Sequence, residues 1–162
     1  MEENKYTFFW GNHFSQWYPS VFVIDGITYK TAEHYMMWCK AKLFHSERIA
    51  DMILESDNPD DVRWLGRQIQ GFDDTIWKQN CKKFVYDGSY AKFTQNADLL
   101  KVLMTTGKTK IVEASPQDFN WGIGLTEEEA KQVPEQKWPG TNWLGEILTQ
   151  LREDLLVGRS NP

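Results

Sequence analysis

The chain has 162 residues, of which 41% are hydrophobic and 25% charged, and its formal net charge is -5. This is the length of one ordinary domain, so we expect a single domain over residues 1–162. No apolar run approaches the roughly 20 residues that a membrane-spanning helix needs, and the charged first residues do not resemble a secretory signal. We therefore expect a cytoplasmic protein with no membrane partner. The acidic balance argues against general coating of nucleic acid but leaves local phosphate recognition open.

The cysteine and tryptophan contents bear on metal binding and on how the core is filled. Cys39 and Cys81 have no Cys or His neighbours at metal-ligand spacing, so both are interpreted as buried apolar residues and no metal site is predicted. The chain contains eight tryptophans, a high number for its length. We expect most of them to fill the core and a minority to stack on a flat ligand.

The first third of the chain predicts a small sheet followed by helices. Residues 6–10 and 21–24 are apolar runs rich in aromatic and β-branched side chains, and Asp25-Gly26 ahead of residues 27–29 predicts a hairpin. Thr31 supplies an N-cap for a helix from Thr31 to Phe44. Ser46 caps a second helix, and Asn58-Pro59 precedes a third over residues 60–68.

Helices also dominate the rest of the sequence. Asp74 opens the longest one, whose expected core-facing stripe consists of Ile76, Cys81, Phe84, Val85 and Ala91. Asn96 caps a helix that ends near Gly107, Ile111-Val112 suits a strand, Thr126-x-x-Glu129 is a capping box, and Asn142 caps the last helix. The predicted class is mainly α (α+β): a compact helical domain with a small N-terminal β-hairpin or sheet.

The helix from Thr31 to Phe44 carries the first candidate site. At 100° per residue, Glu33 and Lys40 fall on one narrow stripe beside an apolar stripe, about 10 Å apart along the axis. An acid and an amine in this arrangement could bracket a ligand in a pocket. The alternative is that Glu33 only complements the helix dipole while the Lys40 amine reaches water. His34 and His45 are interpreted as structural, since His34 points away from Glu33 and His45 lies at the helix end.

Two loops supply further candidates. Residues 118–124 combine Asp118, Trp121 and Gly122 in a segment whose glycines would let backbone approach a ligand, although a plain turn explains them equally well. Residues 140–145 open the last helix, and the free N–H groups around Asn142 and Gly145 could hold a phosphate. No Walker loop, dinucleotide fingerprint or Gly-x-Ser-x-Gly elbow is present.

Taken together, these segments resemble the NADAR, or YbiA-like, superfamily. The matches run in order through residues 22–26, 31–36, 40–41, 65–67, Trp77, 90–93, 112–114, 121–124, 142–145 and Arg152. The resemblance implies a compact helical fold and hydrolysis of an N-glycosidic bond to a phosphorylated ribose. Two substrate classes occur among relatives: ribosylaminopyrimidine phosphates of riboflavin biosynthesis, and ADP-ribose on guanine bases of nucleic acid. No cofactor and no obligate protein partner are implied.

Carried over by position, the family's functional acid falls on Glu33 and its lysine on Lys40. Its aromatic platform falls on Trp77, and its loop carboxylate and indole fall on Asp118 and Trp121. We therefore predict catalytic roles for Lys40, Glu33 and Asp118, and substrate-binding roles for the remaining members of the site, which are Trp77, Trp121, Gly122, Arg67, Asn142 and Gly145.

Two departures from the family pattern bear on ligand contacts: Ile123 stands where some relatives have an acid, and residues 126–139 form a longer stretch than in the shortest relatives.

The preferred mechanism is a Schiff base formed by Lys40, and the rival is direct water attack with Glu33 stabilising an oxocarbenium ion. A module that binds ADP-ribose or NAD derivatives without cleaving them is the non-enzymatic alternative. A helical interaction protein with all its tryptophans in the core is the third.

Overall fold

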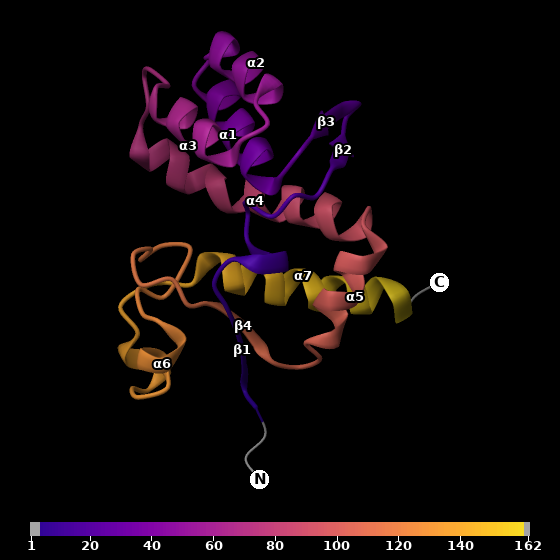
Figure 1. The fold of residues 1–162 in the computed structure, drawn as a ribbon, viewed down its shortest axis with the longest axis vertical. Coiled ribbons are helices and arrows are strands. Elements are labelled where there is room, and N and C mark those ends of the chain that lie inside the picture. Colours follow the sequence, from indigo (N-terminus) through magenta and orange to yellow (C-terminus); the bar gives the residue numbers. More distant parts are fainter. Residues whose placement is uncertain (1–3, 161–162) are drawn as a thin grey trace. The chain divides into compact units, whose positions relative to one another are not determined.

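The computed structural model describes residues 4–160, and helices make up most of this part of the chain (Figure 1). The elements are, in chain order, β1 (Tyr6–Phe9), the 3-10 helix η1 (Asn12–Phe14), β2 (Phe22–Ile24), β3 (Ile27–Tyr29), α1 (Ala32–Leu43), α2 (Glu47–Glu55), α3 (Pro59–Arg67), α4 (Asp74–Thr94), α5 (Ala97–Thr105), β4 (Lys110–Glu113), α6 (Glu127–Ala130), the 3-10 helix η2 (Glu135–Lys137) and α7 (Trp143–Ser160). The predicted class, mainly α with a minor sheet, is confirmed.

The elements fall into two compact units. The first, here called the α1 unit, runs from Gln16 to Leu99 and contains β2, β3 and helices α1 to α4. The second, here called the α7 unit, combines the segment up to Ser15 with the chain from Leu100 onward, and contains β1, β4, α6 and α7.

In the α1 unit, a hairpin packs on a group of helices. Asp25 and Gly26 both have positive φ, 51° and 81°, which is the turn geometry that joins β2 and β3 tightly. The resulting register pairs Phe22 with Tyr29, whose rings stack at 5.8 Å and belong to a core that includes Tyr35. Helix α1 packs against α2, α3 and α4, so it forms the centre of this unit (Figure 1).

The helix boundaries follow the capping residues that the sequence offers. Thr31 accepts a hydrogen bond from the N–H of His34, and Asn58 accepts one from Asp60 at the start of α3. Ser46 is the N-cap of α2 but makes no side-chain capping bond. In α4 the stripe of buried residues is shorter than predicted, because Ile76 is 41% exposed while Cys81 and Val85 are buried. The prediction for Ile76 is therefore wrong.

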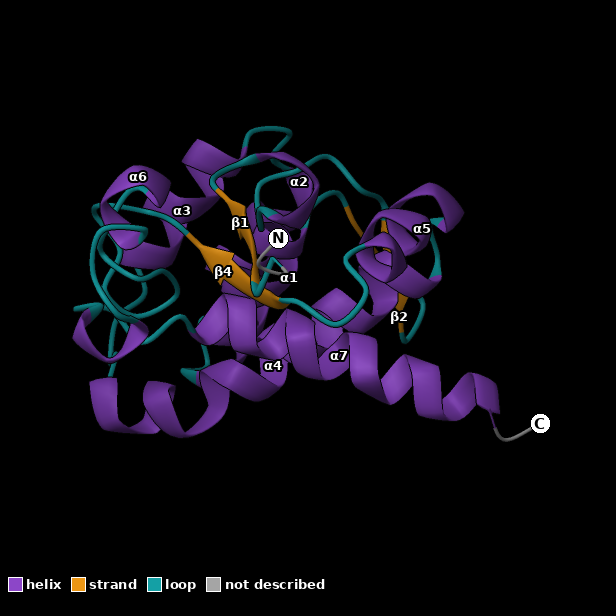
Figure 2. Cartoon of the chain, turned by 90° about the horizontal axis from the view of Figure 1, so that it is seen from below, coloured by secondary structure: helices purple, strands orange, loops and turns teal. Residues whose placement is uncertain are grey.

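The α7 unit is built on a parallel strand pair. Strand β1 pairs with β4 from Tyr6 opposite Lys110 to Phe9 opposite Glu113, and β4 packs against α7 (Figure 2). Val112 and Ile123 form a second buried cluster here. Leu144, Leu148 and Leu151 on α7 are also buried. The small sheet is thus confirmed, but it consists of two separate strand pairs.

The cysteines are buried as expected from the sequence, but the tryptophans are not. Cys39 and Cys81 are buried thiols, and burial raises the pKa of Cys39 to about 12. The expectation that most tryptophans are core residues is wrong, because none is fully buried and Trp10, Trp17 and Trp64 are exposed. Within residues 4–160, no helix combines the length and apolar character needed to cross a bilayer.

Candidate active site

Lys40 lies in the α1 unit at a point where three helices and a loop meet. Its Nζ donates a hydrogen bond to the carbonyl oxygen of Gly66 on α3, at 2.9 Å. The same atom is 4.6 Å from the ring centroid of Phe72, in the loop before α4, and 5.8 Å from that of Trp77 in the first turn of α4. One carbonyl and two aromatic rings therefore surround the amine that the sequence singled out.

Burial disfavours the charged form of the Lys40 amine. Burial lowers the pKa of Lys40 below its usual 10.5, the Glu33 carboxylate opposes this shift, and the Arg67 guanidinium adds to it. A lysine whose pKa is lowered has a larger neutral fraction at physiological pH, and only the neutral amine is a nucleophile.

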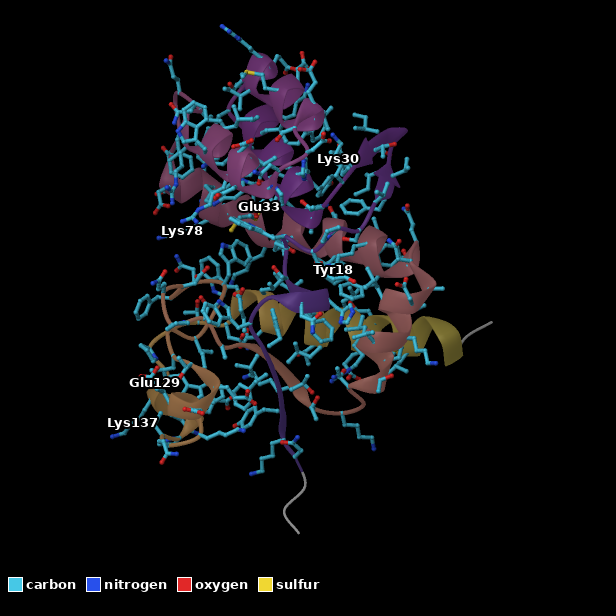
Figure 3. The ribbon with its side chains drawn as sticks, viewed as in Figure 1. Tyr18, Lys30, Glu33, Lys78, Glu129 and Lys137 are labelled. Atoms are coloured by element: carbon cyan, nitrogen blue, oxygen red, sulfur yellow. The ribbon has the colours of Figure 1, made fainter. Side chains whose placement is uncertain are left out.

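Glu33 occupies the first turn of α1 and is only 5% exposed (Figure 3). Its backbone N–H donates to the carbonyl oxygen of Gln16 at 2.9 Å. The rise of a helix places Glu33 about 10 Å from Lys40 along the axis. The Glu33 carboxylate acts to raise the pKa of Lys40, so the two groups are close enough to influence each other's charge.

A glycine on α3 makes the approach to Lys40 possible. A Cβ added at Gly66 would collide with the Sδ atom of Met37, a buried residue of α1. With no side chain at this position, α3 lies close enough to α1 for the Gly66 carbonyl to accept the Lys40 hydrogen bond. Arg67 follows directly and is exposed.

His34 is held by structural hydrogen bonds, as predicted. Its side chain is fully buried, with Nδ1 2.7 Å from the Thr31 hydroxyl and Nε2 2.8 Å from the carbonyl oxygen of Ser56. Because a carbonyl oxygen can only accept, Nε2 carries the proton and Nδ1 accepts from Thr31. Burial lowers the pKa of His34, which keeps the ring neutral.

The remaining predicted residues lie in the α7 unit. Asp118 Oδ1 accepts hydrogen bonds from the backbone N–H groups of Asn120 at 3.0 Å and Trp121 at 2.8 Å. The Trp121 ring meets that of Trp143 edge to face, with centroids 5.4 Å apart. The carboxylate therefore shapes the loop that carries the indole, and its second oxygen is not needed for these two bonds.

The start of α7 differs from the prediction of a phosphate site. The backbone N–H groups of Asn142, Trp143 and Leu144 donate to the carbonyl oxygens of Gly122, Asn120 and Trp121, so they are already used. These three N–H groups are therefore not free to hold a phosphate.

Asn142 and Gly145 instead connect α7 to β4. The Asn142 side chain accepts from the N–H of Glu113 at 2.9 Å and donates to the carbonyl oxygen of Ile111 at 3.1 Å. A Cβ at Gly145 would collide with that same Ile111 oxygen. Gly122 is similarly confined, since a Cβ there would lie 3.0 Å from the carbonyl oxygen of Glu113. These three positions fix the backbone around the Asp118 loop.

The structure thus brings Lys40, Trp77 and the charges of Glu33 and Arg67 together in one unit, and Asp118 and Trp121 in the other. Sequence reasoning missed Phe72 and the Gly66 carbonyl. Phe72 follows Gly71 in a loop outside any periodic pattern, so only its position directly before the N-cap Asp73 could have drawn attention. Among the described residues no cluster of His, Cys, Asp and Glu could hold a metal ion.

Comparison with known proteins identifies the class of the chain. Residues 8–156 match the NADAR domain. The solution structure of the Escherichia coli protein YbiA has the same fold, with a TM-score of 0.81 over 100% of this chain and 91% of that one, at 24% identity. The chain therefore belongs to the NADAR family, as its ordered motifs indicated.

Curated relatives of this family carry informative names. An N-glycosidase of Acanthamoeba polyphaga mimivirus is 42% identical over 95% of this chain and 98% of its own length. The N-glycosidase YbiA of Escherichia coli (strain K12) is 29% identical over 83% of this chain and 75% of its own length. The chloroplastic riboflavin biosynthesis protein PYRR of Zea mays is 30% identical over 82% of this chain but only 20% of its own length.

Proposed function

We propose that this protein is an N-glycosidase, a hydrolase that cleaves the N-glycosidic bond between a phosphorylated ribose and an amine or base. The observation that carries the proposal is the Lys40 amine, which lies 4.6 Å from the Phe72 ring centroid and 5.8 Å from that of Trp77, with its pKa lowered by burial. Two relatives that carry the name N-glycosidase support the same class of reaction. The proposed reaction requires no metal or redox cofactor.

The reaction begins with the substrate as an open-chain imine. A ribose joined through an exocyclic amine can open at its anomeric carbon, giving a carbon–nitrogen double bond that a nucleophile can attack. Neutral Lys40 adds to this carbon, and the original amine leaves with a proton from a neighbouring acid, so that a Schiff base now joins Lys40 to the sugar. Water then adds to the same carbon and expels the Lys40 amine, leaving the free sugar aldehyde and the regenerated lysine.

Proton transfer and substrate stacking are assigned to the remaining side chains. Glu33, which shares the electrostatic environment of Lys40, or Asp118 donates the proton to the leaving amine and takes one from water. Trp77 and Trp121 stack on the base or the opened sugar. Phe72 is 43% exposed while its ring faces Lys40, so it suits the same task.

The rival mechanism is direct attack by water, in which Glu33 stabilises an oxocarbenium ion and Lys40 only binds phosphate. Burial lowers the pKa of Lys40, and a lower pKa increases the neutral, nucleophilic fraction of the amine, so we prefer the covalent route.

Two substrate classes fit this chemistry. One is a ribosylaminopyrimidine phosphate, an intermediate of riboflavin biosynthesis, and the name of the Zea mays relative supports it. The other is ADP-ribose on a guanine base of nucleic acid, which an acidic protein could still bind by accepting one extruded base. In either case Arg67, an exposed cation that acts electrostatically on Lys40, would pair with a phosphate.

We further propose that the two units act as the single domain expected from the sequence, because the family match runs through both. No obligate protein partner is needed for the reaction.

The experiment is to incubate the protein separately with a guanine-ADP-ribosylated oligonucleotide and a ribosylaminopyrimidine phosphate. Release of free ADP-ribose or ribose phosphate, detected by chromatography and mass spectrometry, identifies the substrate class. Binding of ADP-ribose without release of product from either compound would favour the non-catalytic binding module instead.

A further inference from the structure

The ring of Phe72 contacts the Lys40 amine from a loop that the sequence did not single out. Nζ of Lys40 lies over this ring, 4.6 Å from its centroid, while the same atom donates to the carbonyl oxygen of Gly66 at 2.9 Å. Phe72 belongs to the loop between α3 and α4 and is 43% exposed. The amine is therefore held by a hydrogen bond and covered in part by a ring.

The backbone on both sides of Phe72 is fixed by local structure. Gly71 has a φ of 74°, in the left-handed region that other residues rarely adopt. Asp73 is the N-cap of α4, and its Oδ1 accepts hydrogen bonds from the N–H groups of Thr75 at 2.9 Å and Ile76 at 3.1 Å. Phe72 therefore lies between a tight turn and a helix cap, which limits the positions that its ring can take.

A second ring, that of Phe44, packs on Phe72. Their centroids are 5.3 Å apart and the ring planes are inclined by 59°, a favourable arrangement for two aromatic side chains. Phe44 is the C-cap of α1, one turn beyond Lys40, and its backbone N–H donates to the Lys40 carbonyl oxygen at 3.2 Å. The helix that carries Lys40 thus also supplies the support for the ring that contacts the Lys40 amine.

We propose that Phe72 is a positioning residue that keeps the Lys40 amine at the Gly66 carbonyl and limits its contact with water. Phe44 supports this role by packing on the Phe72 ring. This inference rests on the proposed function, in which Lys40 is the nucleophile. It also differs from stacking on the substrate, because a ring that only stacks leaves the amine of the free protein unchanged.

Removing the Phe72 ring should alter the charge of the Lys40 amine. Burial is the largest cause of the lowered pKa of Lys40, and the charged groups that act on this amine are Glu33, which raises the pKa, and Arg67, which lowers it. The ring face itself attracts a cation. Water solvates an ammonium group better than one ring face does, so the return of water should dominate. We therefore expect the pKa of Lys40 to rise toward its usual 10.5 in Phe72→Ala.

The test compares Phe72→Ala with the matched control Tyr90→Ala. Tyr90 is exposed to a similar extent, 49%, and lies on α4 thirteen residues beyond Trp77, about 20 Å along the helix. Labelling with acetic anhydride over a range of pH, followed by peptide mass mapping, gives the pH midpoint at which the Lys40 amine becomes reactive. This midpoint should move to higher pH in Phe72→Ala and stay unchanged in Tyr90→Ala.

Two further variants and a rate measurement sharpen the comparison. Phe72→Tyr keeps the ring and should restore the wild-type midpoint, whereas Phe44→Leu removes the supporting ring and should shift the midpoint in the same direction by less. The single-turnover rate of Phe72→Ala at pH 7 should fall about three- to tenfold, because a shift of one pH unit changes the neutral fraction of the amine tenfold. At alkaline pH, where the amine is neutral in both proteins, the difference should shrink.

The outcomes separate this inference from the proposed function. An unchanged or lower labelling midpoint in folded Phe72→Ala overturns the assignment, even if KM rises. Should Phe72→Ala fail to fold, Phe44→Leu replaces it, and an unchanged midpoint there overturns the assignment equally. If the wild type cleaves neither the oligonucleotide nor the pyrimidine riboside, the proposed function fails. The labelling midpoints still decide on Phe72 in that case, because they are measured without substrate.

Discussion

Replacing Lys40 by methionine should separate turnover from stability. The variant loses the hydrogen bond from Nζ to Gly66 and the approach of the amine to the Phe72 ring. A hydrogen bond from a charged group contributes about 1.5–3 kcal/mol and a partly buried cation–π contact about 0.5–2 kcal/mol. Methionine recovers much of this lost stability. Its apolar side chain can be buried without the desolvation cost that burial imposes on the charged Lys40 amine. We expect a net destabilisation of about 1–2 kcal/mol, or roughly 3–6 °C in Tm for a chain of this length.

The Lys40→Met substitution should have a much larger effect on turnover than on stability. Removing the nucleophile of a covalent mechanism should lower kcat roughly 10³-fold or more. Single-turnover release of ADP-ribose or ribose phosphate measures this, and thermal unfolding of the same sample measures stability. Lys42→Met is the matched control, since Lys42 lies on the same helix but pairs with Glu47 near the surface, and it should keep wild-type turnover. A Lys40→Met protein that retains more than about a tenth of wild-type kcat would refute the nucleophile assignment.

Three further outcomes are expected. Trp77→Leu should raise KM about three- to tenfold in steady-state assays with little change in Tm, because it removes a stacking surface near Lys40; an unchanged KM would exclude that role. Gly145→Ala should destabilise the protein by about 1–3 kcal/mol in urea unfolding, because the new Cβ meets the Ile111 oxygen; wild-type stability would contradict the close approach. His34 has a pKa lowered from 6.5 by burial, so its neutral ring supports folding above pH 6.5 and that support is lost as pH falls below it. His34→Gln should therefore show a weaker loss of stability between pH 7 and pH 5 in urea titrations than the wild type, and identical pH profiles would argue against this assignment.

The local parts of the fold could be predicted because capping residues and hydrophobic periodicity act over short distances. The helix expected from Thr31 to Phe44 is observed from Ala32 to Leu43, with Thr31 as its N-cap. The Asp25-Gly26 turn and the Thr126-x-x-Glu129 capping box are also present. Each of these signals depends on residues within a few positions of one another.

Features that depend on long-range contacts could not be predicted. The parallel pairing of β1 with β4 joins segments about a hundred residues apart, and the residues of neither strand indicate which strand it pairs with. The N–H groups at the start of α7 looked free in the sequence, but the carbonyl oxygens of residues 120–122 accept their hydrogen bonds. Ile76 fits the apolar stripe of α4 but lies in its first turn, where no other element covers it fully.

The candidate site also combines residues that the sequence could predict with contacts that depend on the tertiary structure. Periodicity placed Glu33 and Lys40 on one stripe of α1, and the family resemblance added Trp77, which lies near the Lys40 amine. Phe72 and the Gly66 carbonyl could not be predicted, since their contact with Lys40 depends on how closely α3 approaches α1. Gly66, which has no side chain, faces the Met37 side chain where the two helices approach.

The most direct test of the account is reductive trapping of the covalent intermediate. The protein is mixed with the N-riboside that it cleaves, borohydride is added during turnover, and the protein is digested and mapped by mass spectrometry. A reduced sugar adduct on the peptide that contains Lys40, absent without substrate and absent in Lys40→Met, is the predicted result. Rapid hydrolysis with no adduct on Lys40 would contradict the Schiff-base mechanism.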